Sequence, residues 1–176
     1  MCNFVNIILL FLSFLQPVHC KLCDGRYFDI VGRVVFGEAR NEPMAAKLGV
    51  VYTMLNRMRH EAYPNNLYSV IYERMTTGDY MFQTLNDANH TLEWQQAKIN
   101  RYPEYEDVFQ ATVDALCRYK SDPTTCATNF CSTDPCPATE SNPWWLATNK
   151  IQLGNLYFVC RVSATASRNS RDRGRG

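Results

Sequence analysis

The sequence predicts an α+β domain that is mainly helical, with a small β and loop region near the C-terminus and disulfides as staples. Three observations support this class. Apolar residues recur at helical spacing before residue 120, a Cys- and Pro-rich stretch follows, and residues 151–162 have the composition of a strand. Helices followed by a small β region are typical of α+β domains. The length of 176 residues fits one domain.

The first two predicted helices have the clearest apolar faces. The first ends near residues 37–40, and its face consists of Tyr27, Phe28, Ile30, Val31, Val34 and Val35. Pro43 suits the start of the second helix. The apolar stripe of that second helix consists of Met44, Leu48, Val51, Tyr52, Leu55 and Met58.

Three further helices are predicted between residues 67 and 119. Residues 67–75 form a short one, residues 91–101 a second that stops before Pro103, and residues 104–119 a third. Residues 76–86 combine a Thr-Thr-Gly-Asp turn with aromatic side chains, and they predict a loop or a short hairpin.

The pattern changes after residue 122. Residues 124–145 are rich in Cys, Pro, Thr and Asn, which predicts an irregular segment that needs disulfides to hold its shape. Residues 151–162 predict strand, interrupted at Gly154 and Asn155. Residues 163–176, rich in Arg, Ser and Gly, predict a basic disordered tail.

Residues 1–20 predict a secretory signal peptide. The apolar run at 5–18 has the length of a signal-peptide core, whereas a membrane span needs about 20 residues. Pro17 breaks the helix after the run, and Val18 and Cys20 suit the −3 and −1 positions of a cleavage site. The stub before the run has no Lys or Arg, so an uncleaved N-terminal anchor is the alternative. In either case the domain, residues 21–162, is expected to be extracellular.

Cysteine usage agrees with secretion. Six cysteines follow residue 20, and an even set in a secreted domain predicts three disulfides, among 15 pairings that spacing does not distinguish. They are Cys23, Cys117, Cys126, Cys131, Cys136 and Cys160. A zinc site is the alternative, but the histidines, at 19, 60 and 90, form no zinc-binding motif with them. We therefore expect disulfides and no metal.

Charge is distributed unevenly along the chain. Residues 161–176 hold five Arg and one Asp, whereas residues 1–160 hold 13 basic and 16 acidic residues. The folded part is therefore mildly acidic, which argues against nucleic acid as its ligand. The tail is suited to attraction by anionic surfaces, or it is simply solvated.

The turn between the first two helices holds the best candidate for chemistry. Glu38 directly follows the apolar Val34–Phe36 face, and desolvation there raises the pKa of a carboxyl group, as a general acid requires. Glu42 lies four residues on and is predicted to be structural, either capping the next helix or pairing with Arg40. The alternative is a solvated turn with two ordinary surface acids.

The order of several motifs resembles the SleB-like family of cell-wall hydrolases. That family has an A-E-A-R-G-E-P turn, a V-x-x-V-I-L-N-R-V helix, and P-x-x-V-x-x-V-I-Y, D-P-T-x-G-A-x-x-F and I-G-N-H-x-F elements. The matching segments are residues 37–43, 50–58, 63–72, 122–130 and 153–158. Together they cover roughly residues 28–160.

Some family positions differ. Cys126 replaces a Gly, Leu156 stands where the closing element has His, and the family's Q-F-S segment is only loosely met at residues 81–84. These changes leave open a second class of function, a secreted glycan- or protein-binding relative without catalysis. Glu38 distinguishes the two, because a pure binder needs no acid on that turn.

The resemblance implies a lysozyme-like domain that cleaves peptidoglycan between N-acetylmuramic acid and N-acetylglucosamine. Glu38 would donate a proton to the glycosidic oxygen. In lytic transglycosylases of this type the muramic C6 hydroxyl then attacks C1, so no second acid, cofactor or metal is required. Glu73, Asp79 and Asp87 are the candidates for a hydrolytic base. The protein is expected to act as a monomer.

Other residues are expected to contact the substrate or support the site. Aromatic side chains at Tyr80, Phe82 and Trp144 offer stacking surface for sugar rings. Thr128 and Asn129 lie in a family element that is expected to line the cleft. Asn56 and Arg57, on the second helix, are predicted to tie loops together.

Overall fold

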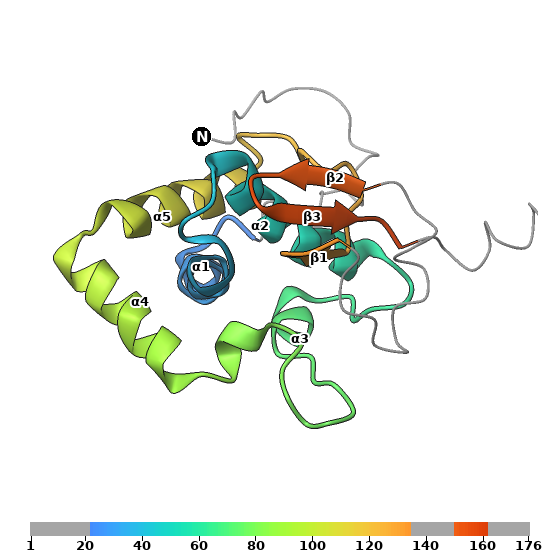
Figure 1. The fold of residues 1–176 in the computed structure, drawn as a ribbon, viewed down its shortest axis with the longest axis horizontal. Coiled ribbons are helices and arrows are strands. Elements are labelled where there is room, and N and C mark those ends of the chain that lie inside the picture. Colours follow the sequence, from blue (N-terminus) through green and yellow to red (C-terminus); the bar gives the residue numbers. More distant parts are fainter. Residues whose placement is uncertain (1–21, 135–149, 162–176) are drawn as a thin grey trace, which may run out of the picture.

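The computed structural model describes residues 22–134 and 150–161. Within these ranges the chain forms helices first and a small antiparallel sheet last, which confirms the predicted α+β class (Figure 1). The predicted signal peptide and basic tail lie outside the described residues. The elements are α1 (Gly25–Ala39), α2 (Met44–Arg59), α3 (Leu67–Ile71), η2 (Gln83–Leu85), α4 (Ala88–Asn100), α5 (Pro103–Leu116), β1 (Asn129–Cys131), β2 (Lys150–Leu153) and β3 (Leu156–Val159).

Helix α1 lies at the centre of the helical part, with α2, α4 and α5 packed around it (Figure 1). Val31, Val34 and Val35 are fully buried, so the apolar face predicted for α1 is the face that enters the core. Asp24 caps the helix by accepting the backbone N–H of Arg26. Helix α1 is therefore capped at its start and buried along one face.

The sheet has the order β1-β3-β2 and packs against α2. Strands β2 and β3 form a hairpin whose turn contains Gly154, with φ of +61°. Phe130 of β1 pairs with Phe158 of β3, and Phe158 is buried against Gly49 of α2. The hairpin therefore sits over the start of α2 and next to the α1–α2 turn.

Several predicted boundaries shift in the structure. The helix predicted over 67–75 ends at Ile71, because Tyr72 leaves helical geometry. In the predicted loop or hairpin at 76–86, Tyr80 forms one bridge, to Arg74 before the segment, and η2 follows. The segment predicted to be irregular contains β1, whose three residues gain their hydrogen bonds from β3 about 28 positions later.

Disulfides join the ends of the helical part and of the sheet. Cys23, before α1, is bonded to Cys117, after α5, and Cys126 is bonded to Cys160. Cys131 is disulfide-bonded as well. Each bond restricts a long loop in the unfolded chain, the first closing 94 residues. The prediction of disulfides is confirmed for these cysteines, while Cys136 lies outside the described residues.

Two other kinds of feature, a membrane span and a metal site, have no candidate within the described residues. None of the helices there is long and apolar enough to cross a membrane. No group of three or more His, Cys, Asp or Glu side chains in the same part of the chain is arranged to hold a metal ion.

Candidate active site

Glu38 lies in the last turn of α1, on the side that faces η2. Its Oε1 accepts a hydrogen bond of 3.1 Å from the backbone N–H of Thr84. Gly37 allows this close approach, because a Cβ added there would lie 1.7 Å from Thr84 Oγ1. The pair Gly37–Glu38 therefore supplies both the acid and the space that its hydrogen-bond donor needs.

Burial raises the pKa of Glu38 above its ordinary value, because the anion loses solvation. The N–H of Thr84 acts in the opposite direction, as do the charges of His90 and Arg57, without cancelling the rise. The desolvation predicted from the apolar face of α1 is thus present. A carboxyl group in this environment holds its proton closer to neutral pH, as a general acid must.

His90 supports the η2 side of the site. It lies in the first turn of α4, and its Nδ1 is 3.1 Å from Thr84 Oγ1. Asp87 caps α4 by accepting the N–H of Asn89, and its carboxylate is 4.0 Å from His90 Nε2. Thr84 is therefore held from two sides: its N–H contacts Glu38 and its hydroxyl contacts His90.

Arg57 brings a buried positive charge close to the site. Its Nε donates to Thr128 O at 2.7 Å, and its guanidinium lies over the rings of Tyr63 and Phe82, at 5.3 and 4.9 Å from their centres. Burial lowers the pKa of Arg57, and the negative charges of Glu73 and Glu38 oppose that shift. Neither Arg57 Nη1 nor Glu73 Oε2, both buried, has a hydrogen-bond partner within the described part of the chain.

The predicted support residues hold the surrounding loops, with partners that the sequence did not identify. Asn56 donates to Asp122 at 2.8 Å and to the carbonyl of Ala127 at 3.1 Å. Arg40 forms an ion pair with Glu93 of α4. These are the contacts through which the two residues hold the loops in place.

Glu42 has other partners than the ones predicted for it. It accepts hydrogen bonds from the backbone N–H and the side-chain amide of Asn155, at 2.8 and 3.2 Å. It does not pair with Arg40, whose partner is Glu93, and α2 has Pro43 at its N-cap and no side-chain cap. The prediction that Glu42 caps α2 or pairs with Arg40 is therefore wrong. Its carboxylate instead fastens the α1–α2 turn to the β2–β3 hairpin.

The residues predicted to contact substrate separate by exposure. Phe82 and Thr128 are 2% and 1% exposed, so both pack in the core and neither presents a surface to a sugar. Tyr80 is half-buried, with Arg74 over its ring at 3.9 Å, and Asn129 accepts a hydrogen bond of 3.0 Å from the hydroxyl of Tyr63. Trp144 lies outside the described residues.

Thr84 and His90 were missed as site residues by the sequence analysis. Thr84 acts through its backbone N–H, which no side-chain motif reveals, and His90 was weighed only as a zinc ligand. The one available signal is Gly37, since a glycine inside a helix indicates close approach by another segment.

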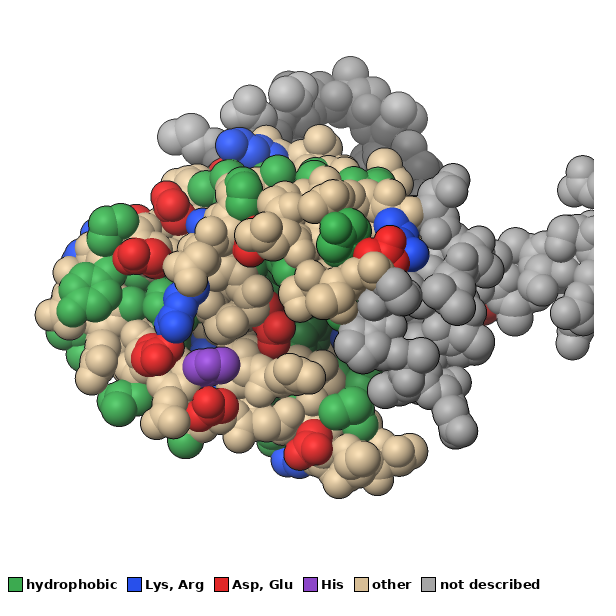
Figure 2. All heavy atoms as spheres, in the orientation of Figure 1, with side chains coloured by type: hydrophobic (Ala, Val, Ile, Leu, Met, Phe, Trp, Pro, Cys, Tyr) green, Lys and Arg blue, Asp and Glu red, His purple; other side chains and the backbone are tan. Residues whose placement is uncertain are grey.

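The face of the molecule drawn in Figure 2 is hollowed near its centre, with an acidic side chain inside the hollow.

Comparisons with known proteins identify a matching family and similar solved structures. A family model described as Cell Wall Hydrolase matches residues 41–159, beginning three residues after Glu38. No curated protein matches the chain.

Two solved structures have the same fold. They are the catalytic domain of the germination-specific lytic transglycosylase SleB from Bacillus anthracis and that of the SleB protein of Bacillus cereus. Both are 22% identical, with TM-scores of 0.52 and 0.50. The match to the first covers 78% of this chain and 96% of the other, and the match to the second 76% and 88%. The chain belongs to the cell wall hydrolase family.

Proposed function

We propose that this enzyme is a secreted lytic transglycosylase that cleaves peptidoglycan between N-acetylmuramic acid and N-acetylglucosamine, with Glu38 as general acid. The observation that carries the proposal is the environment of Glu38: a carboxyl group whose pKa burial raises, held by one backbone N–H at the end of α1. Membership of the cell wall hydrolase family supports the substrate. The disulfides support an extracellular location.

The chemistry needs only one carboxyl group. Protonated Glu38 donates its proton to the glycosidic oxygen, and the bond from that oxygen to C1 of the muramic residue breaks. The muramic C6 hydroxyl attacks C1, and its proton passes to the Glu38 carboxylate. The products are a chain with a new free hydroxyl and a 1,6-anhydro end, and Glu38 is again protonated.

The positions of the other candidate acids favour transglycosylation over hydrolysis. Asp87 is committed to capping α4, and Asp79 lies in an exposed loop, where it accepts from Thr77. Glu73 is the exception, because its Oε2 is buried without a partner among the described residues. If the reaction were hydrolytic, Glu73 would be the group to test as the base.

The test is digestion of purified peptidoglycan over acid to neutral pH, with mass spectrometry of the released fragments. We expect clearing of the wall and fragments with 1,6-anhydro ends. Reducing ends would contradict transglycosylation and point to a hydrolase. If wall is bound and never cleared, the chain is a non-catalytic relative. That second candidate is favoured by Leu156, which is buried at the position of the family's closing His.

A further inference from the structure

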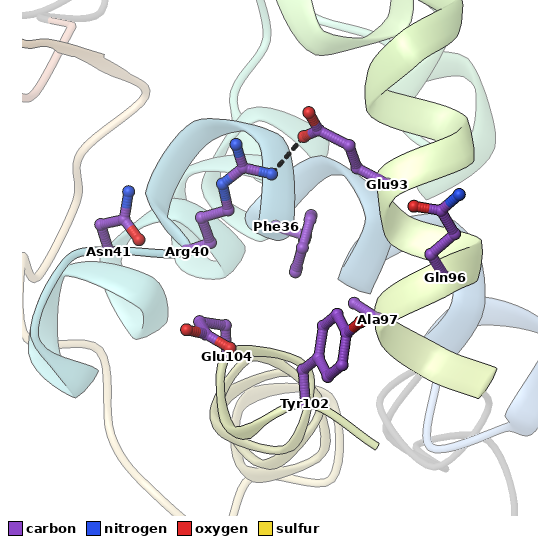
Figure 3. A pocket seen from close by; sticks show the side chains of 8 residues that line it. All are labelled: Phe36, Arg40, Asn41, Glu93, Gln96, Ala97, Tyr102 and Glu104. Atoms are coloured by element: carbon purple, nitrogen blue, oxygen red, sulfur yellow. Dashed lines mark hydrogen bonds and ion pairs between the residues drawn. The ribbon is translucent and has the colours of Figure 1, made fainter. Parts of the chain in front are cut away.

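A cavity of about 240 Å³ adjoins the last turn of α1 and takes no part in the proposed chemistry. It opens between α1, α4 and the start of α5 (Figure 3). Phe36 of α1 and Arg40, at the C-cap of α1, are each two positions from Glu38, about 200° around the helix. The cavity therefore lies on the other side of α1 from the contact with Thr84, yet at the same end of the helix.

The cavity has an apolar floor and one aromatic wall. Phe36 and Ala97 are buried at 4% and 1% exposure, while Tyr102 is 50% exposed. Figure 3 shows the ring of Tyr102 and the side chain of Glu104 on the α5 side, with Phe36 and Arg40 across from them. The volume is below the range of about 300–1,000 Å³ of pockets for drug-sized ligands, so the space suits a single side chain.

The charges around this floor do not balance. Arg40 lies over the ring of Phe36 at 5.0 Å and forms an ion pair with Glu93, so its charge is matched. Glu104, at the other rim, has no ion-pair or hydrogen-bond partner for its carboxylate among residues 22–134 and 150–161. Glu104 is exposed in the first turn of α5, so one negative charge stands at the rim of an apolar floor.

This combination fits an aliphatic chain that ends in an ammonium group. The methylene groups would contact Phe36 and Ala97, and the ammonium would lie between the carboxylate of Glu104 and the ring of Tyr102. Gln96 also lines the cavity, and its amide can hydrogen-bond a peptide group. A sugar ring, which carries no charge there, would leave Glu104 unpaired.

We propose that this cavity binds the diamino-acid side chain of a peptidoglycan peptide stem through its free amine, an inference that rests on the proposed function. Peptide stems are attached to the muramic residues, and one residue of each stem is a diamino acid. The proposal requires the stem of a glycan held at Glu38 to pass around the end of α1 to Glu104. The enzyme then prefers strands whose diamino acids are free over strands whose amines are acylated in crosslinks.

The test compares digestion of untreated peptidoglycan with digestion of the same wall after acetylation of its free amines. The wild type is expected to cleave the acetylated wall about twofold to fivefold more slowly, the factor of an exposed ion pair. Glu104→Gln should cleave both walls at one rate. Glu106→Gln is the matched control, because Glu106 lies in the same helical turn but pairs with Arg101 at 2.9 Å. It should keep the wild-type preference.

Equal wild-type rates on the two walls overturn the proposal, as does a preference that Glu104→Gln retains. If neither wall is cleaved, the proposed function fails, and the cavity is tested by binding alone. NMR titration with Nα-acetyl-lysine methylamide should then shift Tyr102 resonances saturably in the wild type, and less in Glu104→Gln. The norleucine analogue, which lacks the ammonium, should bind several-fold more weakly. Identical titrations with the two compounds overturn the assignment.

Discussion

Two glutamates four residues apart, at the end of α1 and in the turn that follows it, meet opposite environments. Glu38 faces η2, where it is desolvated and receives one backbone N–H, from Thr84. Glu42 lies nearer solvent and receives two donors, both from Asn155 in the β2–β3 hairpin. One carboxyl group is thereby kept ready to hold a proton, and the other is used as an anion that fastens two elements. The element packed against each residue, rather than its residue type, sets its role.

The largest expected effect comes from removing the acid. Glu38→Gln keeps the shape and should lower the rate of peptidoglycan cleavage by about 10²–10⁴-fold, the contribution of a general acid. Zymography and a quantitative turbidity assay measure it, with Glu42→Gln as the matched control, which should retain activity. Equal activity of Glu38→Gln and wild type would remove Glu38 from the mechanism.

The same Glu38→Gln variant should also change how stability depends on pH. The pKa of Glu38 is raised in the folded state, so its ionisation destabilises the fold as pH rises from the ordinary glutamate pKa through the raised one. Gln does not ionise. Thermal unfolding should therefore show equal stability in acid and a more stable variant near neutral pH. A variant that is less stable at neutral pH would show that the anion is the favoured form.

The second effect tests the space beside Glu38. In Gly37→Ala the new Cβ would meet Thr84 Oγ1. The helix η2 must then move, and the backbone N–H of Thr84 loses its hydrogen bond to Glu38. We expect a loss of about 1–3 kcal/mol in unfolding free energy and about 10²-fold in activity. Gly154→Ala is the comparison, because its Cβ would meet Glu42 Oε2 at 2.2 Å. It should lower stability while activity per folded molecule stays unchanged; similar activity losses in both variants would contradict the separation.

A smaller effect is expected from removing the carboxylate of Glu42. Glu42→Ala removes the acceptor for the N–H of Asn155, which should lower the free energy of unfolding by about 0.5–1.5 kcal/mol. Urea titration measures this change. Glu42→Gln, which keeps one acceptor oxygen, should recover part of it. A loss of activity in the folded Ala variant would place Glu42 in the chemistry after all.

The smallest effect should come from His90. Its positive charge lowers the pKa of Glu38, so His90→Ala should raise that pKa. Because the protonated acid is the active form, the alkaline limb of the pH–rate profile should move to higher pH by less than about one pH unit. High salt should shrink the difference by screening. An alkaline limb that moves to lower pH would show that the link to Thr84 matters more than the charge.

Much of the fold was predictable because its signals are local. The apolar stripes of α1 and α2 are visible in consecutive residues, and so are the turn at Gly154 and the even cysteine set. The strand β1 was not, since its three residues pair with β3 far along the chain. The end of α3 was also missed, because the segment that follows turns back through the Arg74–Tyr80 bridge.

The candidate site divides in the same way. The desolvation of Glu38 was predictable because the apolar residues just before it are consecutive in the sequence. Phe82 was misjudged, because an aromatic residue in a polar segment offers no sign of whether it is exposed; here it is covered, with the guanidinium of Arg57 over its ring. Thr84 and His90 became visible only once η2 and α4 were placed against α1.

The sequence by itself determined the helical order, the use of disulfides and the acid at the end of α1, because each depends on neighbouring residues or on composition. Only the tertiary structure decided the donor to Glu38, the partner of Glu42 and the cavity beside Glu104. Those features join α1 and the turn after it to η2, to the β2–β3 hairpin and to α4 and α5. Contacts between distant segments arise from packing, and local sequence patterns do not indicate which segments will meet.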